Sequence, residues 1–251
     1  MKPVLFRIGT FPIRSWGVLV ALGFLVGLFF VRKRAEEKGL SSDIVYDLAI
    51  YILIAGIIGG RLVSVLFDLT YYVKNPLQII MLQSGGMAIH GALIGGFLAT
   101  WYFAKKHDLS LLSLGDIIAP AVLIGQGIGR IGCFLNGDDY GIITKMPWAV
   151  KFPGLVGMRH PTQLYEMALD FIAFVFLWVF RDKFKSNGEM LFTAVIAYSV
   201  IRFFVEIFRA DMGILIWKLT WGEGVSLLAI IVSIIGLIII RKNNSDLKPP
   251  D

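Results

Sequence analysis

Three arginines inside apolar runs are the residues of this sequence that point most directly to chemistry. Arg61, Arg130 and Arg202 each lie among apolar side chains. A charged side chain at the centre of a bilayer costs roughly 2.5–3.5 kcal/mol on insertion scales, so it faces protein or a water-filled cavity. The planar guanidinium matches phosphate oxygens in pairs. These arginines therefore favour a site for a phosphate-bearing lipid headgroup.

The most informative stretch is residues 125–141, which read GQGIGRIGCFLNGDDYG and follow the apolar run 117–124. Its glycines leave room for a neighbouring helix or a lipid headgroup to approach the backbone. Three polar side chains crowd its end: Asn136, Asp138 and Asp139. We interpret this as a polar site at a membrane face, with Arg130 directed at an anion. A helix-packing seam with one structural arginine explains this stretch alone equally well.

Further polar side chains recur within the apolar runs. Tyr198, Arg202 and Glu206 are spaced by four residues and share one helix face, and so do Glu166 and Asp170. An Arg202–Glu206 pair at this spacing is also a plausible structural bridge. Histidine is suited to proton transfer near neutral pH, so His90 could take a proton from a nucleophile. Taken alone, His90 is better explained as a helix-packing residue.

Composition places the chain among integral membrane proteins. Of its 251 residues, 57% are hydrophobic and 17% are charged. The net charge of +6 comes from short segments between apolar runs, as juxtamembrane charges do, and does not indicate nucleic acid. One cysteine, Cys133, excludes an internal disulfide and a cysteine-based metal cluster. The three histidines lack a HExxH-like pairing, so no metal site is expected.

The apolar runs predict an all-α membrane protein: a bundle of seven transmembrane helices in one domain, 1–251. Pro161 suits the first turn of the fifth helix. The segments 68–86, 136–162 and 209–222 form a polar loop region on one side. The expected spans are about 16–31, 44–67, 85–104, 117–135, 161–180, 190–208 and 225–240.

Lysine and arginine are unequally divided between the two sets of connecting segments. The connectors at 32–43, 105–106 and 181–185, with the C-terminal tail, are short and carry the larger share. The positive-inside rule then places the N-terminus outside and the C-terminus in the cytoplasm. We find no convincing internal repeat, which weighs against many transporter folds.

Four motifs, in order along nearly the whole chain, resemble the prolipoprotein diacylglyceryl transferase family of the bacterial plasma membrane. The segment 129–141, GRIGCFLNGDDYG, resembles the family signature. The segment 90–95, HGALIG, resembles its histidine motif, and 160–166, HPTQLYE, resembles its HPSQLYE-type segment. The segment 198–202, YSVIR, with Glu206 and Arg209, resembles its late tyrosine-arginine helix.

The resemblance implies transfer of the diacylglyceryl group of phosphatidylglycerol to the lipobox cysteine of a preprolipoprotein, the first step of bacterial lipoprotein maturation. A thioether forms and glycerol phosphate leaves. Neither a cofactor nor a metal is implied, and the enzyme is expected to act as a monomer in the bilayer. Arg130 and Arg202 are the implied phosphate-binding residues, and His90 is the candidate base. The other implied site residues are Asn136, Asp138, Gly141 and Tyr198, with weaker claims for Arg61, Glu206 and Arg209.

The sequence departs from the usual family pattern in three places. Cys133 stands where the signature usually has asparagine, and Asp138 stands where it often has glutamate. Trp16 precedes Gly17 where the family has a tyrosine. These changes leave the arginines and His90 in place, so activity is expected to be retained, but family roles are not carried onto positions 133 and 16.

Two rival functions remain open from the sequence. A transporter or channel with a polar path lined by the same arginines predicts solute flux and no chemistry. Another lipid-modifying enzyme, such as an acyltransferase, predicts cleavage of an ester and a lysolipid product. A purely structural membrane protein leaves the buried arginines unexplained.

Overall fold

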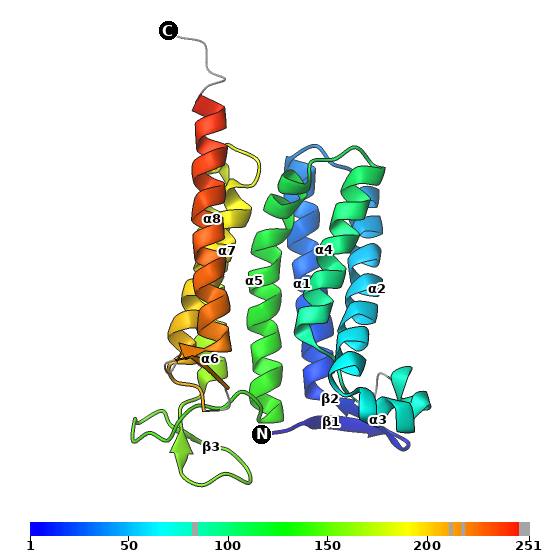
Figure 1. Ribbon diagram of the computed structural model, residues 1–251, viewed down its shortest axis with the longest axis vertical. Helices are drawn as coiled ribbons and strands as arrows, with labels where there is room; N and C mark the ends of the chain where they lie inside the picture. Colours follow the sequence, from blue (N-terminus) through cyan, green and yellow to red (C-terminus); the bar gives the residue numbers. More distant parts are fainter. Residues whose placement is uncertain (82–84, 211–212, 217–218, 246–251) are drawn as a thin grey trace. The chain divides into compact units, whose positions relative to one another are not determined.

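The computed structural model describes all residues except 82–84, 211–212, 217–218 and 246–251. Figure 1 shows a chain built of long helices. The described residues also form three small two-stranded antiparallel sheets. The chain divides into two compact units. The first unit comprises Met1–Val31 and Gly115–Asp251, and the second comprises Arg32–Leu114. Each is described below by itself.

The described residues form seven helices of 18 or more residues. In chain order these are α1 (Ser15–Glu37), α2 (Ser42–Phe67), α4 (Ile89–Lys106), α5 (Leu111–Asn136), α6 (Thr162–Val179), α7 (Glu189–Glu206) and α8 (Trp221–Ser245). The short elements are β1 (Val4–Ile8), β2 (Phe11–Arg14), α3 (Leu69–Lys74), the 3-10 helix η1 (Pro76–Ile79), β3 (Val150–Lys151), β4 (Met158–Arg159), the 3-10 helix η3 (Arg181–Lys183), β5 (Ile214–Ile216) and β6 (Leu219–Thr220).

The protein is an all-α membrane protein that crosses the bilayer several times. Five helices in the described part of the chain, α1, α2, α5, α6 and α8, are long and apolar enough to cross a membrane. The expected count of seven is not confirmed. The other two long helices are more polar, since α4 ends in Lys105 and Lys106 and α7 contains Glu189, Arg202 and Glu206.

Several element boundaries differ from the expected ones. Residues 1–15, which precede the first expected span, contain the β1–β2 hairpin. Helix α1 continues through the charged residues to Glu37, because lysine, arginine and glutamate are good helix formers. Helix α5 begins at Leu111 and not near 117, and Pro120 lies inside it. Pro161 is the residue before α6 and not part of its first turn.

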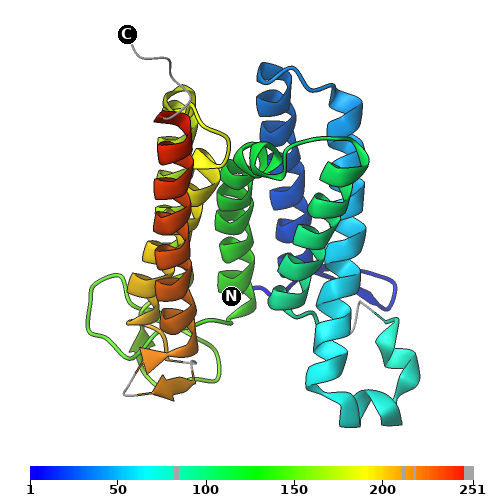
Figure 2. The same cartoon turned by 45° about the horizontal axis from the view of Figure 1, so that its top comes forward.

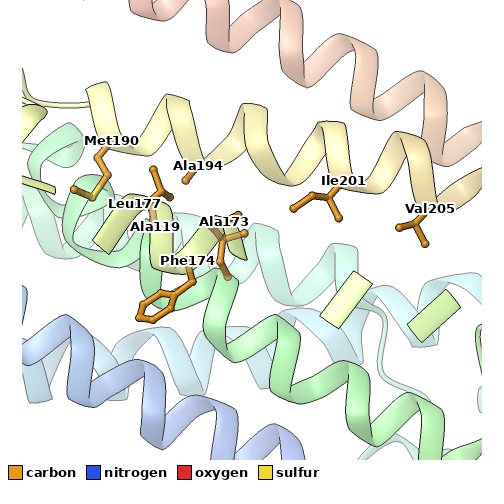
Figure 3. Close-up of a cluster of buried hydrophobic side chains, with 9 residues drawn as sticks. Ala119, Ala173, Phe174, Leu177, Met190, Ala194, Ile201 and Val205 are labelled. Atoms are coloured by element: carbon orange, nitrogen blue, oxygen red, sulfur yellow. The ribbon is translucent and has the colours of Figure 1, made fainter. Parts of the chain in front are cut away.

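The core of the first unit lies where α5, α6 and α7 pack together, as Figure 3 shows. Leu177 on α6 and Met190 on α7 are buried to about 1% exposure or less. Helix α8 lies along α7 in Figures 1 and 2. Its outward side chains, such as Ile231 and Ile238, are more than half exposed, which suits a surface that faces lipid. Packing in this core fixes the relative positions of α5, α6 and α7.

A buried carboxylate fixes the start of α7. Both oxygens of Asp116, on α5, accept hydrogen bonds from backbone N–H groups at the beginning of α7: Gly188 at 2.7 Å and Leu191 at 2.8 Å. The first N–H groups of a helix have no partner within the helix, and the helix dipole favours an anion there. Asp116 thereby links α5 to α7 at the end of the bundle away from Arg202.

In the second unit, α2 and α4 pack at unusually short distance along a line of glycines. A Cβ atom added at Gly91 would lie 2.1 Å from the carbonyl oxygen of Gly59. One added at Gly95 would lie 2.1 Å from the carbonyl oxygen of Ala55. Backbones can approach this closely only where side chains are absent. The glycines at these positions therefore set the spacing of the two helices.

We predict that Gly95→Ala lowers the stability of the protein, because its methyl group forces backbone away from backbone. Overpacking of this kind costs about 1–3 kcal/mol. The matched control is Gly96→Ala, one residue along the same helix, where the added Cβ would meet only Ile52 Cγ2 at 3.6 Å. Thermal unfolding in detergent should show a lower Tm for Gly95→Ala and no loss for Gly96→Ala. Equal Tm values for the two variants would contradict the close-packing interpretation.

Candidate functional site

Arg130 lies near the C-terminal end of α5 and forms two ion pairs with side chains from different segments. One terminal nitrogen is 2.6 Å from Asp139 Oδ2, and the other is 2.8 Å from Glu166 Oε1. Asp139 lies in the loop after α5, and Glu166 lies in the second turn of α6. The Arg130 side chain is only 12% exposed. Its charge is therefore balanced by carboxylates within the protein, as a buried guanidinium requires.

Arg202, on α7, also binds Glu166. Its Nη1 is 3.4 Å from Glu166 Oε2, and its Nη2 is 2.7 Å from Glu206 Oε2. Glu166 is 1% exposed, so the two guanidiniums approach one buried carboxylate from two helices. Arg209 in turn donates to Asp139 Oδ1. We call the six residues the ion-pair network: Arg209, Asp139, Arg130, Glu166, Arg202 and Glu206.

The loop between α5 and α6 is held so that Asp139 reaches its arginines. Thr162 Oγ1 donates to the backbone carbonyl of Asp139 at 2.5 Å, and Gln163 Nε2 donates to that of Asp138. Asp139 has a φ of 59°, in the left-handed region where asparagine and aspartate are among the few tolerated side chains. The first turn of α6 thus positions both Asp139, through the loop, and Glu166, through the helix.

Gly141 has a structural role in the described conformation. Its N–H donates to the carbonyl of His160 at 3.0 Å, and it forms an isolated β-bridge with Arg209. An added Cβ would lie 2.6 Å from the His160 carbonyl oxygen and 2.8 Å from that of Phe208. Only glycine fits at this position. The close approach of the Gly141 backbone to the Phe208–Arg209 backbone keeps Arg209 beside the loop that carries Asp139.

Tyr198 is near the network but not part of an ion pair. Gln126 Nε2, from α5, lies 3.3 Å from the Tyr198 hydroxyl and 3.3 Å from Glu166 Oε1. Asp170, one turn beyond Glu166 on α6, is 0% exposed, and neither of its oxygens has a hydrogen-bond partner among the described residues. Gln126 and Asp170 therefore complete the polar surroundings of Glu166 within the bundle.

The other predicted residues of the signature lie at the edge of this region. Asn136 Nδ2 donates to Asp138 Oδ2, and Asp138 is exposed. Cys133 Sγ is 4.0 Å from Arg130 Nη1, a weak contact at the distance limit for sulfur. In the described part of the chain, the carboxylates that pair with Arg130 are Asp139 and Glu166, and not Asp138. The structure brings together Arg130, Arg202, Glu206, Arg209 and Tyr198 of the expected set.

Arg61 and His90 belong to the second unit. The guanidinium of Arg61 donates to five backbone carbonyls, including those of Ile79 at 2.8 Å and Met81 at 3.1 Å, and Arg61 is 6% exposed. All of its N–H groups are thus engaged in holding the segment after α3. His90 is exposed in the first turn of α4.

The sequence predicted the arginines of the ion-pair network but not the carboxylates that connect them. Glu166 and Asp139 connect the arginines, yet neither was among the expected site residues, and Gln126 was also missed. The available signal was charge balance. Three arginines near apolar helices need anionic partners, and Glu166 is a charged residue in the early turns of the apolar helix α6. Among the described residues, no group of His, Cys, Asp and Glu side chains has an arrangement suited to a metal ion.

Asp139 stays ionised because of its two arginines. Burial by itself raises the pKa of this carboxyl, but the charges of Arg209 and Arg130 outweigh that effect and hold the pKa below its usual value. The ionised form is therefore part of the folded structure at neutral pH.

Comparison with known proteins shows the family of the chain. The family model described as prolipoprotein diacylglyceryl transferase matches residues 3–239. The chain belongs to the prolipoprotein diacylglyceryl transferase family. Relatives named phosphatidylglycerol–prolipoprotein diacylglyceryl transferase include that of Geobacter sulfurreducens, 38% identical over 231 residues and covering 89% of each chain. That of Clostridioides difficile is 35% identical and covers 98% of each chain. That of Staphylococcus aureus MW2 is 36% identical and covers 96% of this chain and 90% of the relative.

We predict that the contribution of Asp139 to stability disappears in acid. Because its folded pKa lies below the unfolded one, the ionised form stabilises the protein above the unfolded pKa, and this is lost as pH falls through the folded pKa. The free energy of unfolding of Asp139→Asn should be about 1–3 kcal/mol lower than that of the wild-type protein at pH 7. The difference between the two free energies should become smaller below about pH 4.

Denaturant unfolding in detergent at several pH values measures this difference. The matched control is Asp138→Asn, since Asp138 is adjacent and exposed and should show little change at any pH. A difference between Asp139→Asn and wild type that is constant with pH would contradict the ion-pair explanation.

Proposed function

We propose that this protein transfers the diacylglyceryl group of phosphatidylglycerol to the lipobox cysteine thiol of preprolipoproteins, forming a thioether and releasing glycerol phosphate. Membership of the family and the names of its relatives support this reaction. The single structural observation that carries it is the approach of Arg130 and Arg202, from α5 and α7, to one buried carboxylate, Glu166.

Two guanidiniums that share one small anion are spaced to share another. In the proposed mechanism, Arg130 and Arg202 bind the phosphate of the donor lipid and offset the charge that grows as it leaves. Preorganised donors in a water-poor site lower such barriers by several kcal/mol, and removal of one such donor costs roughly 2.7–4 kcal/mol in a well-studied case. Glu206 and Arg209 orient the pair, since Glu206 binds Arg202 and Arg209 binds Asp139, the partner of Arg130. Tyr198 is proposed to act through Gln126, which lies between its hydroxyl and Glu166.

The proposed roles of the other expected site residues are supported by their motifs, their chemistry or their backbone contacts. His90 is proposed to deprotonate or orient the substrate thiol, on the strength of its motif and of imidazole chemistry. Asn136, Asp138 and Gly141 shape the loop beside Arg130, and Gly141 is the one with direct structural support, through its contact with the Arg209 segment. Arg61 is proposed to act by fixing the segment after α3, because its donors are all engaged by backbone carbonyls.

We propose further that the chain works as one domain and one monomer in the bacterial plasma membrane. The family model extends across both units, which supports a single functional domain. All seven long helices are proposed to cross the bilayer, with α4 and α7 supported by partners along their length. The N-terminus would lie outside and the C-terminus in the cytoplasm, which puts the loop carrying Asp139 on the outer side.

We predict that Arg130→Ala folds but does not lipidate a lipobox peptide in the presence of phosphatidylglycerol. Arg130→Lys should retain charge but lose most activity, because an ammonium cannot bind bidentately. His90→Ala should also fail. The control is Arg7→Ala, an exposed arginine on β1. Mass spectrometry of the peptide measures the product, and normal transfer by Arg130→Ala would contradict the phosphate-binding role.

The same assay separates the rival functions. A diacylglyceryl thioether with glycerol phosphate supports the proposal. A lysolipid with an acylated product would indicate an acyltransferase. No covalent product, together with solute flux in liposomes, would indicate a transporter or channel.

We predict that a cysteine at Lys145 is labelled from outside intact cells and that one at Lys183 is not. Lys145 lies in the loop between α5 and α6, Lys183 lies in the connector between α6 and α7, and both are exposed. The variants Lys145→Cys and Lys183→Cys, made in a Cys133→Ser background, would be tested with a membrane-impermeant maleimide. The reverse pattern would contradict the proposed orientation.

A further inference from the structure

We propose that Glu166 is an internal counter-anion that the donor's phosphate replaces, and that it takes up a proton when the phosphate binds. This rests on the proposed function, because it concerns the same phosphate site. It adds a role for Glu166, the last residue of the segment 160–166, and a coupling that the family resemblance does not assign. Phosphate binding and proton binding would then be linked at one carboxyl group.

The geometry gives Glu166 the place that a phosphate would need. Its Oε1 is 2.8 Å from Arg130 and its Oε2 is 3.4 Å from Arg202, so one oxygen faces each guanidinium. A phosphate group also carries several oxygens, so it can place one against each guanidinium. The Nε of Arg130 is buried and has no hydrogen-bond partner among the described residues. Arg130 therefore retains a donor that the carboxylates leave unused.

Every guanidinium of the ion-pair network already has a carboxylate partner, so the network has no unpaired cation for an incoming anion. Within the described residues, three guanidiniums alternate with three carboxylates, and each guanidinium already contacts at least one of them. A phosphodiester adds one negative charge. Either that charge stays uncompensated in a poorly hydrated site, which is costly, or one carboxylate is neutralised.

Glu166 is the carboxylate that loses most when the phosphate takes its arginines. Asp139 keeps Arg209 and is 26% exposed, so water also stabilises it. Glu206 keeps the hydroxyl of Thr220 at 2.9 Å and the Nη2 of Arg202, because the nitrogen of Arg202 that faces Glu166 is Nη1. Glu166, at 1% exposure, keeps only the amide of Gln126.

The other groups that face Glu166 do not replace the lost cations. Among the described residues, the groups that face Glu166 are Gln126 and Arg130 from α5, Tyr198 and Arg202 from α7, and Asp170 on its own helix. The only cations among them are the two arginines that the phosphate would occupy. Asp170 is a second buried carboxyl group one turn away, so a charge left on Glu166 would also face a potential like charge. A protonated Glu166 carries no charge, so it needs neither the two arginines nor distance from a charged Asp170.

The consequence is that donor binding becomes tighter as pH falls. If one proton enters with each phosphate, the affinity changes by up to about tenfold per pH unit wherever Glu166 is ionised in the free protein. Loss of the carboxylate should remove this dependence. A merely structural glutamate would not produce it, because the phosphate would then bind without a change in protonation.

Calorimetric titration tests the coupling without the transfer reaction. Dihexanoyl-phosphatidylglycerol is titrated into the full-length protein in nonionic detergent, with no acceptor peptide, in buffers of different ionisation enthalpy between pH 6 and 8. The slope of binding enthalpy against buffer ionisation enthalpy gives the number of protons taken up. We expect about one proton per lipid for the wild-type protein.

Three variants assign the proton. Glu166→Gln should bind the lipid with no proton uptake and with an affinity that does not change with pH. Glu166→Asp keeps a carboxyl group and should restore the uptake. The matched control is Asp170→Asn, at a buried site on the same helix, which keeps the Glu166 carboxylate and both arginines and should therefore retain the uptake. Size-exclusion profiles and Tm values confirm that each variant is folded.

Each other outcome overturns the inference. Lipid binding by wild type without proton uptake contradicts it and leaves the proposed transferase function standing. Uptake that persists in Glu166→Gln, or that disappears in Asp170→Asn, assigns the proton to a different group. Absence of lipid binding by the wild-type protein contradicts the phosphate site itself, and with it the proposed function.

Discussion

The structure of the first unit depends on the cost of placing charged groups among apolar helices. A guanidinium or carboxylate without a partner in such surroundings costs several kcal/mol, whereas an ion pair with good geometry recovers most of that cost. Arg130 and Arg202 are each nearly enclosed, and each binds two carboxylates. Helices α5, α6 and α7 must therefore keep the separation and rotation at which these groups meet.

Apolar packing holds α5, α6 and α7 at the separation and rotation that the ion pairs require. The cluster around Leu177 and Met190 fixes the three helices at one level, and Asp116 fixes the first turn of α7. The ion pairs lie further along the same helices. Alternating charges would give little stability on an exposed surface, but here they define which helix faces meet. A site preorganised in this way suits a reaction in which a phosphate leaves with increased negative charge.

The arginines identified from their residue type alone have two different roles. Arg130 and Arg202 bind side-chain carboxylates, which a competing anion can replace. Arg61 binds backbone carbonyls, which belong to the fold and have no alternative partner. The role of each arginine therefore depends on the group that it binds, and residue type alone does not reveal it. Family resemblance and membrane depth gave Arg61 a weak claim on substrate, and its hydrogen bonds favour a structural role.

The sequence by itself determined the membrane class, the approximate positions of the long helices and the motifs that show the family, because apolar runs and local spacing are properties of neighbouring residues. It also placed Arg202 and Glu206 on one helix face. Only the tertiary structure decided that Glu166 joins Arg130 to Arg202 and that Asp139 joins Arg130 to Arg209. Arg130 and Asp139 are nine residues apart, and the other partners are tens of residues apart. Helix packing and loop conformation, which no local pattern encodes, bring them together.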